Sequence, residues 1–164
     1  MNDIKFMPLK NGGFTIVDAD LFEHYNQFVW YEGPTGYMVR YTNTPSQPRR
    51  HLHLHREILP LEKGLCVDHI NGFRFDNTKR NLRAATKSQN GLNRPKMRNS
   101  RLRYKGVSYH PGYWRARLVV NGKQIVKYFK TEIAAKKGYD ELVKLHCGEF
   151  ARIEPDNHVT AYPE

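Results

Sequence analysis

Four side chains in the middle of the sequence combine a base with oxygen ligands for a metal ion. Asp68 and His69 are adjacent, and Asn81 and Asn90 follow them within residues 67–93. A neutral imidazole, with an ordinary pKa of about 6.5, can take a proton from water. A carboxylate and a carboxamide oxygen suit Mg2+, which keeps several of its waters and shares oxygens of a phosphate substrate. These residue types predict hydrolysis of a phosphodiester bond.

Two short strands are expected to position the first of these residues. Residues 65–67 are typical of a strand that delivers Asp68 and His69 at its end, and residues 81–85 are typical of a second strand. The loop between them is rich in Asn, Asp and Gly, whose side chains and turns tie down backbone amides. We therefore expect Asn81 to bind the backbone of this loop rather than the substrate.

A helix is expected to bring the last residue to the others. Thr86 and Gln89 match a capping box, in which each side chain binds the backbone N–H of the other residue. A helix that starts there carries Asn90 in its first turns. The expected order is therefore strand, loop, strand and helix, with the end of the first strand facing the helix.

The charge distribution points to nucleic acid as a partner. The chain has 164 residues, 39% of them hydrophobic, and 27 basic residues against 16 acidic ones, for a net charge of +11. Residues 1–58 hold six of each sign, so the whole excess lies further along the chain. A basic surface gains free energy by releasing counterions from a polyphosphate.

Composition also excludes several protein classes. Two cysteines, Cys66 and Cys147, cannot form a disulfide framework or a four-cysteine zinc site. We find no signal peptide and no apolar run of about 18 residues, so we expect no membrane association. A cytoplasmic location, in a bacterium or a phage-infected cell, is the expectation.

Residues 1–58 are expected to form a small β-rich region. A strand is predicted at residues 13–18, followed by a brief helix that Asp20 caps and that runs to residue 28. Two further strands are predicted around residues 29–31 and 37–41.

Three histidines alternate with leucines at the end of this region. Within a predicted strand over residues 49–58, His51, His53 and His55 would lie on one face. The polar side of a half-buried strand is the simpler interpretation, and a structural zinc module is a weaker alternative. Arg56 is a candidate for an accessory phosphate contact.

The last third of the chain divides into a basic linker and a second folded unit. Residues 95–103 form the linker, which is expected to follow a phosphate backbone or a minor groove. Residues 104–153 form the folded unit, and residues 154–164 a tail. Strands are predicted at residues 105–110, 113–120 and 123–129, and Thr131 is expected to cap a helix that runs to about His146. The free face of this sheet is expected to present Lys105, His110, Arg117 and Lys123.

The middle stretch resembles the HNH endonuclease family, in its phage and homing branches. The matching residues are Val67-Asp68-His69-Ile70-Asn71-Gly72, Asp76-Asn77, Asn81-Leu82-Arg83 and Ser88-Gln89-Asn90. The resemblance implies a ββα-metal fold over residues 59–94. It also implies that His69 is the general base, Asn81 the structural middle member of the catalytic set, and Asn90 the third member, which binds the metal ion together with Asp68. Many members carry His where this chain has Asn90.

Residues 104–153 resemble an AP2-type DNA-binding domain. The resemblance is carried by Tyr104-Lys105-Gly106-Val107, Tyr113-Trp114-Arg115-Ala116, Phe129-Lys130-Thr131, Ala134-Ala135, Gly138-Tyr139-Asp140 and Gly148-Glu149-Phe150-Ala151. It implies that the sheet contacts DNA and that Tyr139 reaches phosphate from the helix. Ser108, Val119 and Ile125 depart from the plant pattern, so the plant recognition sequence does not transfer.

The sequence therefore predicts an α+β protein that cleaves double-stranded DNA with Mg2+ or Mn2+ bound. A monomer should nick, whereas a homodimer could cut both strands. The alternative is a DNA-binding regulator with a degenerate, inactive nuclease fold. The predicted DNA contacts are Arg56, Arg94, Lys96, Arg98, Arg101, Arg103, Lys105, His110, Arg117, Lys123 and Tyr139.

Overall fold

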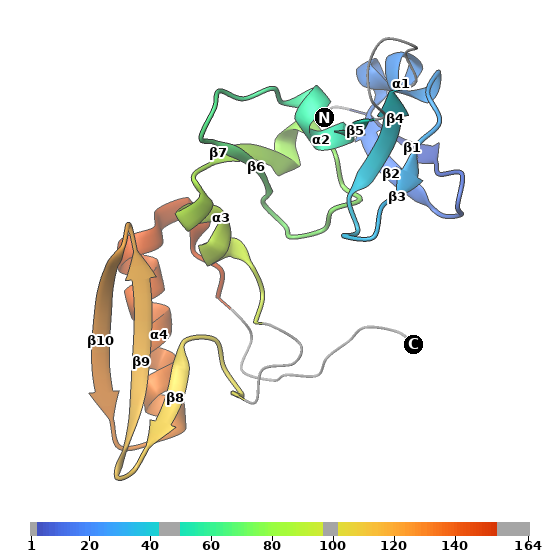
Figure 1. Ribbon diagram of the computed structural model, residues 1–164. Helices are drawn as coiled ribbons and strands as arrows, with labels where there is room; N and C mark the ends of the chain where they lie inside the picture. The colour runs from blue at the N-terminus through green and yellow to red at the C-terminus, as the bar shows by residue number, and fades with distance from the viewer. Residues whose placement is uncertain (1–2, 43–49, 97–101, 154–164) are drawn as a thin grey trace. The chain divides into compact units, whose positions relative to one another are not determined.

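The computed structural model describes residues 3–42, 50–96 and 102–153 (Figure 1). The chain forms two compact units, Met1–Asn90 and Gly91–Glu164. Small antiparallel sheets and a few helices make up both of them, which confirms the predicted α+β class. No described helix is long and apolar enough to span a bilayer.

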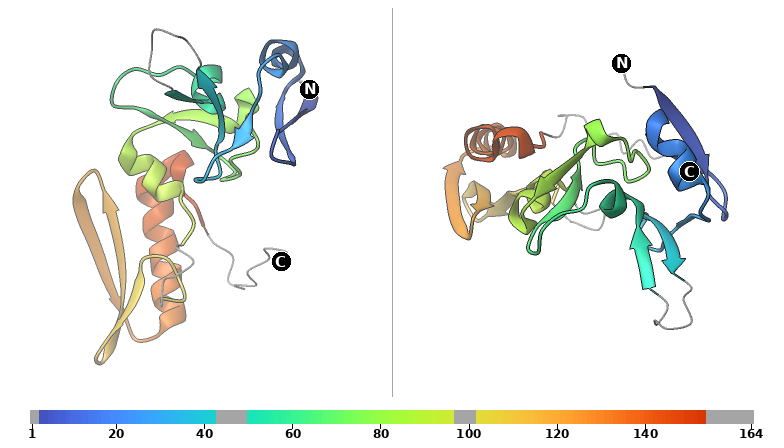
Figure 2. Two further views of the ribbon diagram at one scale, coloured as in Figure 1. Left: turned by 45° about the vertical axis from the view of Figure 1, so that its right-hand side comes forward. Right: turned by 90° about the horizontal axis from the view of Figure 1, so that it is seen from above.

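The first unit begins with a hairpin of β1 (Ile4–Pro8) and β2 (Phe14–Asp18), followed by α1 (Ala19–Asn26) (Figure 2). β1 was not predicted, although its pairing with β2 buries Met7 beside Val17 in the core. The predicted cap Asp20 is wrong: Asp18 occupies the N-cap, and Asp20 lies in the first turn, where it pairs with Lys79.

A second sheet consists of β3 (Tyr31–Glu32), β4 (Met38–Thr42) and β5 (Arg50–His53), and α2 (Leu54–Ile58) follows directly. The predicted strand over residues 49–58 is therefore wrong in its second half. In a helix, Leu54 and Ile58 lie one turn apart, and both pack on the core around Trp30. α2 also carries Glu57, whose Oε1 accepts from Arg40 Nε at 3.0 Å.

The middle of the chain folds in the predicted order. β6 (Cys66–His69) pairs antiparallel with β7 (Leu82–Ala85), the one-turn helix η1 (Lys79–Asn81) precedes β7, and α3 (Lys87–Asn93) follows it. The predicted capping box is confirmed. Gln89 N donates to Thr86 Oγ1 at 3.2 Å, and Thr86 N donates to Gln89 Oε1 at 2.8 Å.

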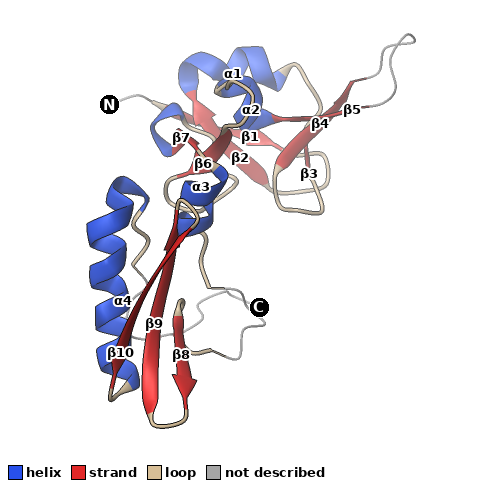
Figure 3. Ribbon diagram, turned by 60° about the vertical axis from the view of Figure 1, so that its left-hand side comes forward, coloured by secondary structure: helices blue, strands red, loops and turns tan. Residues whose placement is uncertain are grey.

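The second unit contains a three-stranded antiparallel sheet and a helix beside it, as predicted (Figure 3). The strands are β8 (Val107–His110), β9 (Tyr113–Val120) and β10 (Lys123–Phe129), with β9 in the centre. α4 (Glu132–Cys147) begins at Thr131, whose hydroxyl accepts from Ala134 N, and the short helix η2 (Gly148–Phe150) follows. The core between sheet and helix contains Val107, Ala116, Leu118, Ala135, Leu142 and Val143.

Candidate active site

His69 ends β6 as a buried side chain with a fixed partner. The imidazole is 5% exposed, and its Nε2 lies 3.3 Å from Asn77 Oδ1. Asn77 is itself fully buried, and its amide nitrogen binds Thr15 Oγ1 at 2.8 Å and the Arg74 carbonyl at 3.1 Å. Burial is the main cause that lowers the pKa of His69, so the ring is neutral at pH 7 and able to accept a proton.

The imidazole of His69 also packs against other rings. The ring centroid of His55 lies 5.3 Å from that of His69, edge to face, and Tyr37 contacts both rings at 4.8 and 6.0 Å. His55 is 4% exposed. Burial and the neighbouring imidazoles of His69 and His53 lower the pKa of His55 to about 3. His55 is thus a neutral ring at pH 7 that packs against the ring of His69.

The stability of the protein should fall in mild acid because of His55. The unfolded chain takes up a proton at a pKa of about 6.5, whereas the folded chain does so only at about 3. Stability is therefore lost as the pH falls through this window, by about 1.4 kcal/mol per pH unit at the steepest. Urea unfolding at pH 7 and pH 5 should show this loss. His55→Phe should reduce it and the exposed His51→Phe should not; equal pH dependence in all three proteins would contradict the assignment.

The predicted single face of three histidines does not form. His51 contacts Tyr41, with ring centroids 4.6 Å apart, whereas His55 lies on α2 rather than on a strand. Within residues 3–42, 50–96 and 102–153, no three His, Cys, Asp or Glu side chains are arranged to hold a metal ion. The zinc hypothesis therefore has no support in the described part of the chain.

Asp68 is held by an arginine that the sequence analysis did not select. Arg83 Nε and one terminal nitrogen lie 2.9 and 2.8 Å from Asp68 Oδ2, and both side chains are largely buried. The two residues are direct partners in the β6–β7 register. Because residues opposite each other on paired strands lie on one face, the pairing explains the contact. The guanidinium fixes the direction of the carboxylate.

Asn90 lies on the same side of β6 as Asp68. Its amide Nδ2 is 3.4 Å from Cys66 Sγ, and Cys66 precedes Asp68 by two residues on the strand. Alternate residues of a strand share a face, so α3 covers the face that carries the carboxylate. A carboxylate and a carboxamide oxygen on one face are hard donors that fit Mg2+, which needs few protein ligands. Bound there, the ion would stabilise negative charge on a phosphate.

Asn81 binds the loop backbone, the role expected for it. Its Oδ1 accepts from Asn71 N at 3.0 Å, and its Nδ2 donates to the Asp76 carbonyl at 2.7 Å. Asn71 closes the same loop by donating to Asp76 Oδ2 at 2.8 Å. These bonds hold both ends of the loop that follows His69.

The N-terminal hairpin holds the other side of this loop. Ile16 N donates to the Phe75 carbonyl and accepts, through its own carbonyl, from Asn77 N, both at 2.8 Å. Asp18 Oδ2 accepts from Lys79 N at 2.7 Å. The electrically neutral N-terminal third, for which the sequence suggested no role, is thus part of the framework of the site.

The candidate DNA contacts outside the second sheet are placed as follows. Arg56 lines a cleft of about 370 Å3 together with Lys63 and Cys66. Lys96 donates to the Leu102 carbonyl at 2.7 Å. Arg103 is largely exposed and lies 3.9 Å from Glu132. Arg94 is exposed, and Arg98 and Arg101 lie outside the described residues.

The sheet register divides the remaining candidates. Arg117 pairs with Val126, and His110 with Tyr113, on the face away from the buried Ala116 and Leu118. Lys123 pairs instead with Val120, which places it on the helix side, so its predicted place on the free face is wrong. Arg115, which was not selected, joins the free face and donates to Ser108 Oγ.

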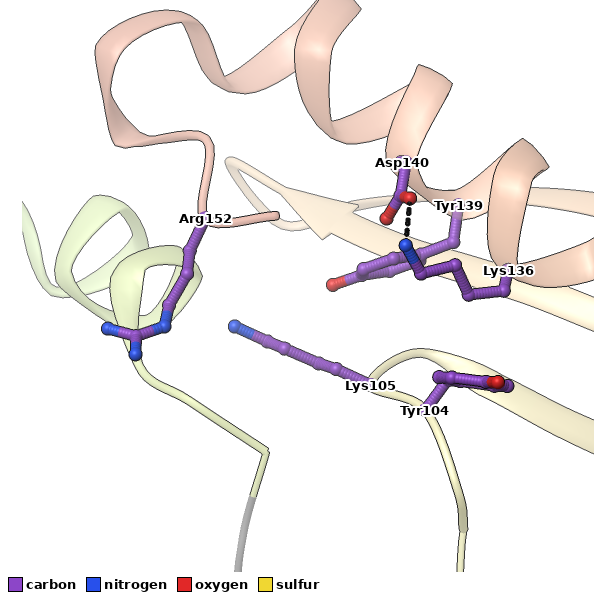
Figure 4. A pocket seen from close by; sticks show the side chains of 6 residues that line it. All are labelled: Tyr104, Lys105, Lys136, Tyr139, Asp140 and Arg152. Carbon is purple, nitrogen blue, oxygen red and sulfur yellow. Dashed lines mark hydrogen bonds and ion pairs between the residues drawn. The ribbon is translucent and has the colours of Figure 1, made fainter. Parts of the chain in front are cut away.

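Lys105 and Tyr139 line a small pocket of the second unit (Figure 4). Lys105 Nζ donates to the carbonyls of Leu92 and Arg94 at 2.7 and 2.6 Å, and to that of Gly91 at 3.3 Å. The Lys105 ammonium thus binds the carbonyls at the C-terminal end of α3, where a cation is favourable. Tyr139 is 6% exposed and packs on Gly106. The described contacts of both residues are internal, and their contact with DNA stays a prediction.

Comparisons with known proteins agree with this geometry. Residues 57–92 match a family model described as HNH endonuclease. An uncharacterised HNH endonuclease of Acanthamoeba polyphaga mimivirus is 31% identical over 142 residues, which are 85% of this chain and 74% of that protein. No solved structure matches the chain significantly.

Proposed function

Because the chain belongs to the HNH endonuclease family, we propose that it is a metal-dependent nuclease that hydrolyses double-stranded DNA, with His69 as the general base. The observation that carries the proposal is the buried, neutral His69, held by Asn77 next to the ion pair of Asp68 and Arg83. Attack of water on a phosphodiester needs a base with a fixed ring, and a metal ion that the carboxylate of the preceding residue can bind.

The residues divide the reaction between them. His69 takes a proton from the attacking water through Nδ1, since Nε2 is directed at Asn77. Asp68 and Asn90 would hold the divalent ion, Mg2+ or Mn2+, which would supply charge stabilisation for the phosphate and the leaving oxygen. Arg83 orients Asp68. Asn81 keeps the loop after His69 closed, so the base does not move away from β6.

The second unit would direct the nuclease to DNA. Its free sheet face presents Arg115, Arg117 and His110, and the register places no acidic residue on it. Tyr113 stacks on His110 at 5.3 Å and contacts Tyr128 at 5.2 Å, which stiffens the face. A three-stranded ribbon of this kind can enter a major groove, as the AP2-like pattern of the sequence implies.

Incubation of the protein with supercoiled plasmid DNA tests the proposal. We expect nicked circles with Mg2+ or Mn2+ and no product in EDTA, because the carboxylate and amide need the ion to act on phosphate. Linear product at early times would indicate paired cuts by a dimer. Binding to the plasmid without cleavage under every metal would favour the alternative, a DNA-binding regulator.

Arg117→Ala should weaken DNA binding more than Lys123→Ala. Both changes remove one positive charge from the same sheet, but the register places Arg117 on the free face and Lys123 on the helix side. Loss of a contact to a base edge costs about 1–3 kcal/mol of binding free energy. Loss of a contact to phosphate lowers the slope of log binding constant against log salt concentration by about one. Fluorescence anisotropy on labelled duplex at several salt concentrations measures both. Equal losses in the two variants would contradict the assigned face.

A further inference from the structure

We infer that Thr15, on the N-terminal hairpin, is a positioning residue for His69. Acting through Asn77, it holds the imidazole in the tautomer that carries hydrogen on Nε2, and so leaves Nδ1 as the basic atom. The consequence for catalysis rests on the proposed nuclease function, whereas the tautomer does not.

The three side chains form a continuous buried chain of hydrogen bonds. Thr15 Oγ1 lies 2.7 Å from the Phe75 carbonyl, and Asn77 Nδ2 lies 2.8 Å from Thr15 Oγ1. Asn77 Oδ1 lies 3.3 Å from His69 Nε2. Thr15 and Asn77 are fully buried, so water cannot replace a lost partner in this chain without a rearrangement.

The direction of every bond follows from two backbone carbonyls, those of Phe75 and Arg74. The Phe75 carbonyl can only accept, so the Thr15 hydroxyl must donate to it and offer a lone pair to Asn77. The Arg74 carbonyl accepts from the same Asn77 nitrogen at 3.1 Å. Two acceptors therefore identify this end of Asn77 as the NH2 group, and its oxygen must face the imidazole. A neutral His69 then satisfies that oxygen only with hydrogen on Nε2.

Thr15 is held in place by the strand that carries it. β2 pairs with β1 and, through Ile16, with the backbone of Phe75 and Asn77 on its other edge. The pairing fixes the backbone of Thr15, so its hydroxyl can leave the chain of bonds only by rotation of the side chain within a fully buried site. Through a hydrogen bond between two residues 62 positions apart, Thr15 and Asn77, the N-terminal hairpin thus sets which nitrogen of the His69 ring is basic.

Nuclear magnetic resonance of the full chain, with 15N-labelled histidine, tests the tautomer without any cleavage assay. At neutral pH we expect the His69 signals of a protonated Nε2 and an unprotonated Nδ1. In Thr15→Val, which keeps the shape of the side chain but removes the hydroxyl, a population with hydrogen on Nδ1 should appear. A wild-type ring with hydrogen on Nδ1, or an unchanged tautomer in Thr15→Val, would overturn the inference even if the protein proves to be a nuclease.

Plasmid nicking by the same variants tests the catalytic consequence. We expect Thr15→Val to lower kcat about 10- to 100-fold with KM for DNA unchanged, the range typical for a lost partner that fixes an imidazole. Thr15→Ser should recover most of the rate because it restores the hydroxyl. Thr78→Val is the matched control, since Thr78 is equally buried but donates to Asp76; it should keep the wild-type tautomer.

A wild-type kcat in Thr15→Val, or a Thr15→Ser variant as slow as Thr15→Val, would contradict the role of the hydroxyl. If the wild type does not cleave DNA, the proposed function fails and the tautomer measurement still decides the inference.

Discussion

His69→Ala should lower the rate of plasmid nicking by about 1,000-fold at saturating Mg2+ and leave the affinity for DNA unchanged. General-base catalysis contributes roughly 100- to 10,000-fold to an enzymatic rate, and His69 is the neutral imidazole that the fold places next to Asp68. Removal of the ring leaves the carboxylate, the amide and the cationic surfaces in place. The loss should therefore fall on kcat.

The control for this experiment is His51→Ala, which removes an imidazole that contacts Tyr41 rather than His69. It should cleave at the wild-type rate. Circular dichroism and binding to labelled duplex should show that His69→Ala remains folded, since the variant leaves a cavity beside His55 and Tyr37. Equal cleavage by His69→Ala and wild type would rule out His69 as the base.

Gly106→Ala should destabilise the second unit by about 3 kcal/mol or more, a loss of at least about 10 °C in Tm. A Cβ at this position would lie 2.0 Å from a ring carbon of the buried Tyr139, and Gly106 has a φ of +71°. Tyr139 is enclosed by the core of the unit and cannot move aside. The backbone strain adds to the steric overlap.

Gly112→Ala separates these two causes. Gly112 also has a positive φ, of +89°, but a Cβ there meets no atom within 4 Å. Its substitution should therefore cost only the conformational strain, about 1–2 kcal/mol. Calorimetry of the full chain measures both variants. Equal losses would show that the contact with Tyr139 adds nothing to the strain.

Local features of the fold were predictable because their causes lie within a few residues. The capping box of Thr86 and Gln89 and the cap at Thr131 are formed by neighbours in sequence. The turn between β9 and β10 needs the positive φ that Asn121 and Gly122 adopt. The strand β1 was missed because its short run shows little alternation and Met7 is its one buried residue.

The types of the candidate catalytic residues and their order are properties of the sequence alone. Asp68 and His69 are adjacent, and Asn90 directly follows a capping box. These features predicted phosphodiester hydrolysis. They also predicted the order strand, loop, strand and helix. Asp68 and His69 lie on one short strand and Asn90 on one short helix. Such short elements can be predicted from the hydrophobic pattern and from capping residues.

Only the tertiary structure decided which partners act on these residues. The sheet register brings Arg83 to Asp68 and turns Lys123 away from Arg117. The fold also places His55 against His69 and directs Lys105 to the carbonyls after α3. These contacts join residues of different elements, so no local pattern of the sequence records them. The sequence alone therefore identifies the candidate base, His69. Its hydrogen-bond partner and the rings that pack against it are known only from the folded structure.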